Sequence, residues 1–226
     1  MPFHKRKLKH FSEFESHALL ALLLIQVLAA PFVLKDGAGV WLGLLHATYQ
    51  AILFIFLVGV GGSRRQLTLC VGFIAVGEVV SILGLPSDRW GALISDLLAG
   101  AATSVVLVVA TRRFLASETV TRAMMSAAIA LYLMSGVLWA LLFNVIEGVY
   151  PGSFTTSEGQ VDAADLLYFS YVTMTTLGYG DIAPASEWAR SAALLQALYG
   201  QFFVAVVIGR LVAVYVAGQG RRDEAK

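Results

Sequence analysis

Six long apolar stretches limit what this chain can fold into more than any other feature of its sequence. They cover residues 17–34, 40–60, 67–85, 90–111, 123–145 and 188–217. Each approaches or exceeds the length of about 20 residues that a bilayer-spanning helix needs. Backbone groups in lipid must bond within the protein, so we expect helices, and the alternating pattern of a transmembrane barrel is absent. The predicted fold class is an all-α membrane protein with six transmembrane helices.

Composition agrees with this fold class. Hydrophobic residues make up 58% of the 226 residues, and charged residues make up only 14%. A soluble domain of this size could not bury so much apolar surface. The chain is therefore expected to have membrane lipid as a partner and is not expected to bind nucleic acid.

The basic residues that flank the apolar stretches predict the orientation of the helices. They gather before the first stretch, between the second and third, between the fourth and fifth, and after the last: Lys5, Arg6, Lys7, Lys9, Arg64, Arg65, Arg112, Arg113, Arg122, Arg221, Arg222 and Lys226. The other connections carry only Lys35, Arg89 and Arg190. Because basic loops stay in the cytoplasm, we expect a multi-pass plasma-membrane protein with both termini cytoplasmic.

The first apolar stretch has a second interpretation, as a signal peptide cleaved after Val27-Leu28-Ala29. Pro31 lies close to that cleavage site, and a long charged segment precedes the stretch. Both features favour a retained helix over a signal peptide. The preceding segment, with Phe11 and Phe14 among its basic residues, is expected to rest on the inner membrane surface.

A short capped helix is predicted between the last two stretches. Asp162 can cap this helix, and Asp165 falls in its first turn, where a carboxylate is favourable. The apolar run that follows gives a helix of about 12 residues, or about 18 Å, which is too short to cross the membrane. We expect it to enter from outside and stop partway, with the partial negative charge of its C-terminal end favouring a cation.

The five residues 176–180, Thr-Leu-Gly-Tyr-Gly, must then lead the chain back outside. Non-helical backbone at membrane depth is tolerated where it lines a pore or is covered by protein. Gly178 and Gly180 can take positive φ at little cost, which would let successive carbonyls face one axis. The Thr176 hydroxyl can add an oxygen at the inner end, and the Asp181 carboxylate can attract cations to the outer mouth.

The run from Thr173 to Asp181 resembles the signature sequence of potassium channels. In that family four such loops surround one axis, and their carbonyl oxygens replace the hydration shell of the ion. The resemblance covers roughly residues 123–217. It implies a selectivity filter that binds potassium ions at the following residues, with Gly180 completing it: Thr176, Leu177, Gly178 and Tyr179. An ordinary extracellular turn is the alternative interpretation of Gly-Tyr-Gly-Asp.

Since one chain supplies one loop, the resemblance implies a homotetramer with a central fourfold axis. Three residues behind the filter, Phe169, Val172 and Thr175, are expected to support it. Leu177 stands where the family most often has Val. Val172 replaces a Glu that pairs with the outer Asp in some members, and Phe169 replaces a Trp that hydrogen-bonds to the filter tyrosine in many members.

Gly200 lies where the family often has a hinge glycine in its pore-lining helix. Steps of four residues lead from it to Val204, Ile208 and Val212 on one face of the helix. We expect this face to line the cavity and, as an apolar ring, to close the pore by dewetting. The alternative is that the valines and Ile208 pack against the fifth stretch and that Gly200 serves close packing.

The first four stretches resemble the voltage sensor of six-span potassium channels in number only. Residues 90–111 contain no arginine, and Arg112 and Arg113 stand at their cytoplasmic end. Because charge must cross the membrane field to sense voltage, we expect weak or no voltage dependence.

Three ionisable residues lie at a similar depth, about 10 Å from the outer surface, on three of these helices: His46, Glu78 and Asp96. Ionisable groups are costly in the membrane and usually have partners. One interpretation is a proton or divalent-metal sensor. The other is a static polar network that fixes helix packing.

The chain is thus expected to comprise a cytoplasmic basic segment (1–16), a four-helix membrane domain (17–111), a cytoplasmic linker (112–122), a pore domain (123–217) and a cytoplasmic tail (218–226). The predicted function is passive, potassium-selective conduction with potassium as the bound ion. A less selective cation channel and a non-conducting regulatory membrane subunit are the alternatives. No catalytic cluster or nucleotide loop indicates an enzyme, and no cytoplasmic ligand-binding domain is recognised in this chain.

Overall fold

The computed structural model describes residues 13–36, 39–82, 89–117, 121–157 and 159–223, and these residues are mostly helical. The helices are α1 (Glu13–Asp36), α2 (Gly39–Gly59), α3 (Arg64–Ile82), α4 (Arg89–Ala116), α5 (Arg122–Val149), α6 (Ala163–Met174) and α7 (Glu187–Asp223). Two short strands, β1 (Phe154–Thr156) and β2 (Ile182–Pro184), flank α6 and the segment that follows it.

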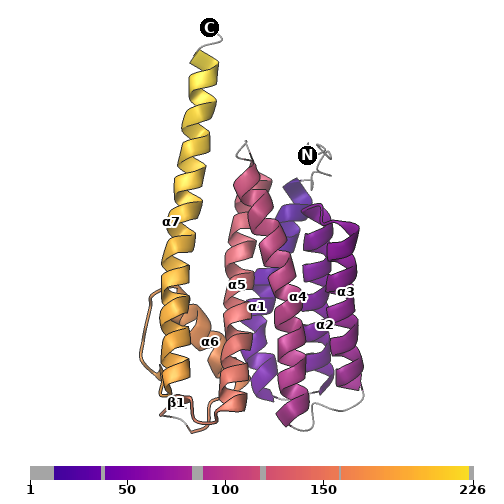
Figure 1. Ribbon diagram of the computed structural model, residues 1–226, viewed down its shortest axis with the longest axis vertical. Coiled ribbons are helices and arrows are strands. Elements are labelled where there is room, and N and C mark those ends of the chain that lie inside the picture. Colours follow the sequence, from indigo (N-terminus) through magenta and orange to yellow (C-terminus); the bar gives the residue numbers. More distant parts are fainter. Residues whose placement is uncertain (1–12, 37–38, 83–88, 118–120, 158, 224–226) are drawn as a thin grey trace.

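All the helices except the short α6 run alongside one another, and α7 stands on the α5 side of the bundle (Figure 1). Consecutive helices alternate in direction, so the start of α1 and the end of α7 lie at one end of the bundle (Figure 1). The start of α3 at Arg64, the last turns of α4 near Arg113 and the start of α5 at Arg122 lie at that same end. Helix α6 and strand β1 lie towards the opposite end.

The long helices correspond to the six predicted stretches. Among the described residues, three helical segments are long and apolar enough to cross a membrane: Trp90–Ala116, Ala123–Val149 and Glu187–Val214. Shorter apolar segments are His17–Val33 and Leu44–Gly59. Length and composition therefore support three spans, and crossing by α1, α2 and α3 stays a prediction.

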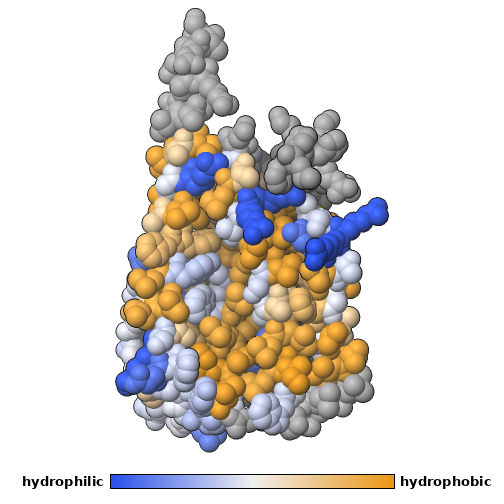
Figure 2. All heavy atoms as spheres, viewed as in Figure 1, coloured by the Kyte–Doolittle hydropathy of each residue, from blue (hydrophilic) through white to orange (hydrophobic). Residues whose placement is uncertain are grey.

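Three apolar clusters hold the described helices together, and the smallest of them joins α1, α5 and α6 at Ala30, Ala140 and Leu167. The largest joins α1 to α5 and contains fully buried side chains such as Leu53, Val106 and Met134. The second joins α5, α6, α7 and the strands around Phe143. Hydrophobic residues also cover much of the face of the helices that Figure 2 shows, and many large apolar side chains are exposed, which suits a lipid surrounding rather than water.

Strands β1 and β2 pair in antiparallel fashion, with Phe154 opposite Pro184 and Thr156 opposite Ile182. This pairing was not predicted from the sequence. It joins the loop before α6 to the chain that follows residues 176–181. The part of the chain between β1 and β2 is therefore held at both of its ends by this pairing.

Candidate functional site

Helix α6 has the length and the cap that the sequence predicts. It spans 12 residues, Ala163–Met174, and begins after Asp162. The Asp162 carboxylate accepts a hydrogen bond from the Asp165 amide at 2.9 Å, and the Asp165 carboxylate accepts one from the Asp162 amide at 3.1 Å. This reciprocal capping box satisfies two amides that a helix start would otherwise leave unpaired.

Side-chain hydroxyls on α5 and α6 hold α6 in place. Tyr171 donates to the Leu133 carbonyl at 2.7 Å, and Tyr132 donates to the Met174 carbonyl at 3.1 Å. The Tyr171 ring lies so close to Gly136 that a side chain at position 136 would overlap it. The C-terminal end of α6 is therefore fixed against the middle of α5.

The backbone after α6 takes a left-handed conformation at every second residue. The φ angles of Thr176, Gly178 and Gly180 are 59°, 57° and 79°. Positive φ at the two glycines confirms the sequence-based expectation. Positive φ at Thr176 was not predicted, and such a conformation is unfavourable for a non-glycine residue. Alternating handedness turns successive carbonyls towards the same side of the chain.

The amides of this segment point back towards α6. Leu177 donates to the Val172 carbonyl at 2.9 Å, and Gly178 donates to the same carbonyl at 3.3 Å. The Thr175 hydroxyl donates to the Tyr171 carbonyl at 2.7 Å. Carbonyls at the end of α6 thus satisfy the amides of Leu177 and Gly178.

Within one chain, residues 175–181 are exposed. Leu177 is 54% exposed and Tyr179 is 67% exposed. A segment of non-helical backbone between apolar helices is thus left uncovered by its own chain, although its ends are fixed.

The three residues predicted to support the filter lie on α6 or at its end, just before this segment. Phe169 and Val172 are buried. The Phe169 ring packs on the rings of Phe143 and Phe154, with centroids 5.2 Å and 5.3 Å apart. Thr175 follows the last residue of α6, and its hydroxyl donates to the Tyr171 carbonyl in the last turn of that helix.

Tyr168, which was not selected from the sequence, lies beside Asp181. The pKa of its phenol is raised above the ordinary value, first by desolvation and then by a side-chain hydrogen bond to Asp181. The Tyr168 hydroxyl therefore lies within reach of the Asp181 carboxylate, although Val172 offers no carboxyl group. The signal for this residue was a hydroxyl-bearing aromatic directly before Phe169.

A carboxylate near the end of α5 fixes the loop that follows this helix and was also missed from the sequence. Glu147 accepts hydrogen bonds from the amides of Gly152, at 2.7 Å, and Phe154, at 3.0 Å. Phe154 begins β1, which pairs with β2 just after Asp181. The Pro-Gly turn at 151–152, close after a Glu, was the available signal.

Gly200 on α7 is buried against the end of α6. A Cβ atom added there would overlap the carbonyl oxygen of Met174. The close-packing interpretation of Gly200 therefore describes the structure. The other residues of the predicted pore-lining face are exposed: Val204 (43%), Ile208 (56%) and Val212 (56%). In one chain α5 does not cover them.

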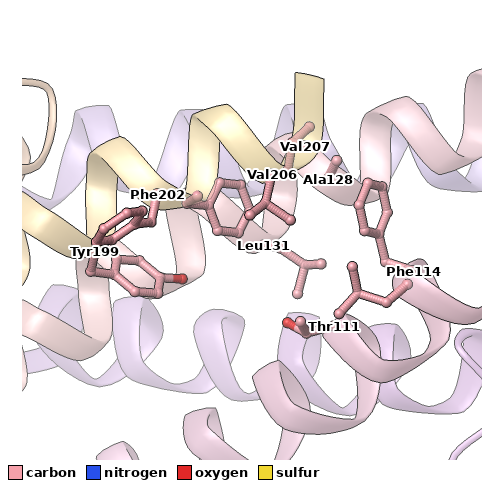
Figure 3. Close-up of a pocket in the computed structure, with 10 residues that line it drawn as sticks. Thr111, Phe114, Ala128, Leu131, Tyr199, Phe202, Val206 and Val207 are labelled. Carbon is pink, nitrogen blue, oxygen red and sulfur yellow. The ribbon is translucent and has the colours of Figure 1, made fainter. Parts of the chain in front are cut away.

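The opposite face of α7 is turned towards α4 and α5 instead. A cavity of about 180 Å³ lies between these helices and is lined by apolar and aromatic side chains, among them Leu131, Tyr199 and Phe202 (Figure 3). Arg210 lies one turn beyond the α7 part of this lining and donates to the Ser117 carbonyl, just after α4. At about 100° per residue, the face of α7 that carries Val204, Ile208 and Val212 lies on nearly the opposite side of the helix from this lining.

The predicted sensor residues are only partly described. His46 lies exposed on α2, Asp96 lies half-buried on α4, and the side chain of Glu78 on α3 is outside the described part. Among the described residues, no group of three or more His, Cys, Asp or Glu side chains could hold a metal ion. The sensor and the static network both stay predictions.

Comparison with known proteins connects part of this chain to ion channels. Residues 119–217 match the family model described as ion channel, a segment that contains α5, α6, residues 176–181 and most of α7. No solved structure matches the chain significantly.

Several curated potassium channels are similar to this chain. The inward rectifier potassium channel Kirbac3.1 of Paramagnetospirillum magnetotacticum is 37% identical over 87 residues, which are 37% of this chain and 26% of the relative. Two pore potassium channel c of Oryza sativa subsp. japonica is 42% identical over 64 residues, 28% of this chain and 14% of the relative. Two-pore potassium channel 1 of Arabidopsis thaliana is 37% identical over 91 residues, which are 40% of this chain and 23% of the relative. The chain thus matches about a quarter or less of each relative's length.

Proposed function

We propose that this chain is one subunit of a potassium-selective ion channel, and that residues 176–180 form its selectivity filter. The observation that carries the proposal is the left-handed backbone at Thr176, Gly178 and Gly180, directly after a capped helix of 12 residues. This backbone turns a row of carbonyl oxygens to one side, which is the ligand set that replaces the hydration shell of K⁺. The match of residues 119–217 to ion channels supports the same function.

The unit that conducts is proposed to be a homotetramer. The filter segment and the outer face of α7 are exposed in one chain, and exposed non-helical backbone cannot remain inside a membrane without cover. Two of the relatives are named two-pore channels, whereas the filter sequence occurs once here. Four copies around one axis would cover the segment and complete the ring of carbonyls.

In the proposed orientation, six helices cross the plasma membrane with both termini in the cytoplasm, and α6 enters from outside. Its negatively polarised end then faces the inner cavity, where it stabilises a cation. The exposed face with Val204, Ile208 and Val212 would line this cavity and form the apolar gate. The absence of arginine from residues 90–111 of α4 supports weak or no voltage dependence.

A less selective cation channel is the second candidate, because it would use the same plan. The complete Gly178-Tyr179-Gly180 triplet favours potassium over this alternative.

Potassium efflux from liposomes tests the proposal. Purified protein is reconstituted in liposomes loaded with potassium chloride, which are then diluted into a large organic cation. We expect efflux through the wild type. Gly178→Ala places a side chain at a φ of 57°, so it should slow efflux by at least about fivefold.

The matched control for this assay is Gly72→Ala on α3. Its Cβ would meet nothing within 4 Å, so the variant should keep the efflux rate of the wild type. An absence of efflux through the wild type would contradict the proposed function, and equal rates in all three proteins would contradict the filter assignment.

A further inference from the structure

A buried glutamine joins the three helices that surround the filter. Gln196 on α7 is fully buried. Its Nε2 donates to the Ser170 carbonyl at 2.9 Å and to the Ser170 hydroxyl oxygen at 2.7 Å. The Ser170 hydroxyl in turn donates to the Gly136 carbonyl on α5 at 2.7 Å. One chain of hydrogen bonds therefore runs from α7 through α6 to α5.

This arrangement is a poor means of stabilising the fold. The Gln196 Oε1 atom has no hydrogen-bond partner among the described residues, and an unpaired buried acceptor lowers stability. A leucine of similar size would remove that penalty. Ser170 would keep its bond to Gly136 without Gln196, so the substitution would leave no new unpaired hydroxyl proton.

The glutamine instead fixes how α6 is oriented against α7. Apolar contacts between two helices tolerate small rotations and shifts, whereas a side chain bonded to two atoms of one residue defines both the rotation and the depth of α6. Polar groups are retained in some proteins because they specify one geometry. Here the specified geometry is that of the helix whose end carries the filter.

The contact lies where such a geometry matters. Ser170 is one turn before Met174, and the Val172 carbonyl between them accepts from the Leu177 and Gly178 amides. One turn along α7 from Gln196 lies Gly200, which contacts the Met174 carbonyl. A rotation of α6 would therefore move the acceptor of two filter amides.

We propose that Gln196 is a positioning residue of the filter: by holding Ser170, it keeps α6 in the orientation in which residues 176–180 conduct. The proposal rests on the proposed function and extends it to a residue outside the filter motif. It predicts that removing the side-chain amide disturbs conduction while leaving the stability of the protein unchanged or higher.

The test compares wild-type protein with Gln196→Leu and with the control Gln26→Leu. Gln26 also donates from Nε2 to a carbonyl, that of Leu45 at 2.8 Å, and its Oε1 is also unpaired among the described residues. It joins α1 to α2 and does not bond to α6. The control thus removes a similar amide without touching the filter helix.

Two readouts are used on each protein. In bilayer recordings with equal potassium on both sides, Gln196→Leu should enter a non-conducting state roughly fivefold faster than the wild type, the factor expected for one lost hydrogen bond. In hydrogen exchange measured by mass spectrometry, the peptide containing the Leu177 and Gly178 amides should exchange faster in Gln196→Leu. Gln26→Leu should match the wild type in both, and neither variant should unfold at a lower temperature.

Unchanged exchange in the filter peptide of Gln196→Leu would overturn the proposal. So would a lower unfolding temperature with unchanged conduction, because that pattern belongs to a residue that only stabilises the fold. A wild type that carries no potassium current would refute the proposed function instead. In that case the exchange experiment, which needs no current, still decides the role of Gln196.

Discussion

Gly200→Ala tests the contact between α7 and the end of α6 more directly than any other substitution. The added Cβ would overlap the Met174 carbonyl oxygen. That atom belongs to the backbone, and the Tyr132 hydroxyl also binds it. It cannot rotate away as a side-chain tip could. Either α7 moves outwards or the end of α6 moves. A movement of α6 would disturb the proposed filter, because that segment begins two residues after Met174.

The expected magnitude follows from two opposing effects. Replacing glycine by alanine inside a helix stabilises by about 0.5–1 kcal/mol, because glycine loses more conformational freedom on folding. Overfilling a packed contact costs about 1–3 kcal/mol. Gly200→Ala should therefore range from neutral to about 2 kcal/mol destabilising.

Gly209→Ala is the matched control on the same helix. A Cβ at Gly209 would meet nothing within 4 Å, so only the helix-forming effect applies. The control should be about 0.5–1 kcal/mol more stable than the wild type. The two variants should differ by about 1–3 kcal/mol, the cost of the overlap alone.

The assay is thermal unfolding of the purified protein in detergent, followed by potassium efflux from liposomes. One kcal/mol shifts the unfolding midpoint by about 2–4 °C in a protein of this size, so the two variants should be clearly separated. Gly200→Ala should also reduce efflux, and Gly209→Ala should not. If both variants gain stability equally and conduct alike, α7 does not contact α6 at Gly200, and the reasoning is refuted.

Two further predictions concern the outer end of the filter. Tyr168→Phe removes the hydroxyl beside Asp181, so potassium currents should decay faster by a factor of about 2 to 5. Adding Asp181→Asn to this variant should change the decay little further. Fully additive effects in a double-mutant cycle would show that the two residues do not interact. Glu147→Leu leaves the Gly152 and Phe154 amides without their acceptor, so it should destabilise by about 2 kcal/mol. Glu147→Gln keeps one acceptor oxygen and should lose less, and equal midpoints in thermal unfolding of all three proteins would contradict this role of Glu147.

Helix α6 could be predicted closely because its determinants are local. The cap, the first-turn carboxylate and the length all depend on Asp162, Asp165 and the apolar run after them. The positive φ of Gly178 and Gly180 was predictable for the same reason, since glycine alone adopts it without cost.

The helix ends were less predictable than the helices themselves. Helix α4 continues past Arg112 and Arg113 to Ala116, and α7 continues to Asp223. An apolar stretch marks where lipid is tolerated, and a helix can extend into water beyond it because its backbone bonds remain internal. Hydropathy therefore located the stretches and not their ends.

The remaining features of the site depend on residues far apart in the sequence. Tyr168 meets Asp181 only once residues 175–181 have folded back along α6, and β1 pairs with β2 across α6 and these residues. In the sequence, Gln196 is one polar residue in an apolar helix. Its role becomes visible only when α6 is placed against α7. Such contacts are set by tertiary packing, which a local pattern does not contain.

The reversal potential of a wild-type channel in a planar bilayer tests the central claim most directly, with potassium on one side and sodium at equal concentration on the other. Each factor of ten in preference for K⁺ moves the reversal potential by about 59 mV. We predict a displacement of at least about 100 mV in the direction that marks K⁺ as the more permeant ion. A reversal potential near zero would contradict potassium selectivity, and the absence of any current would contradict conduction itself.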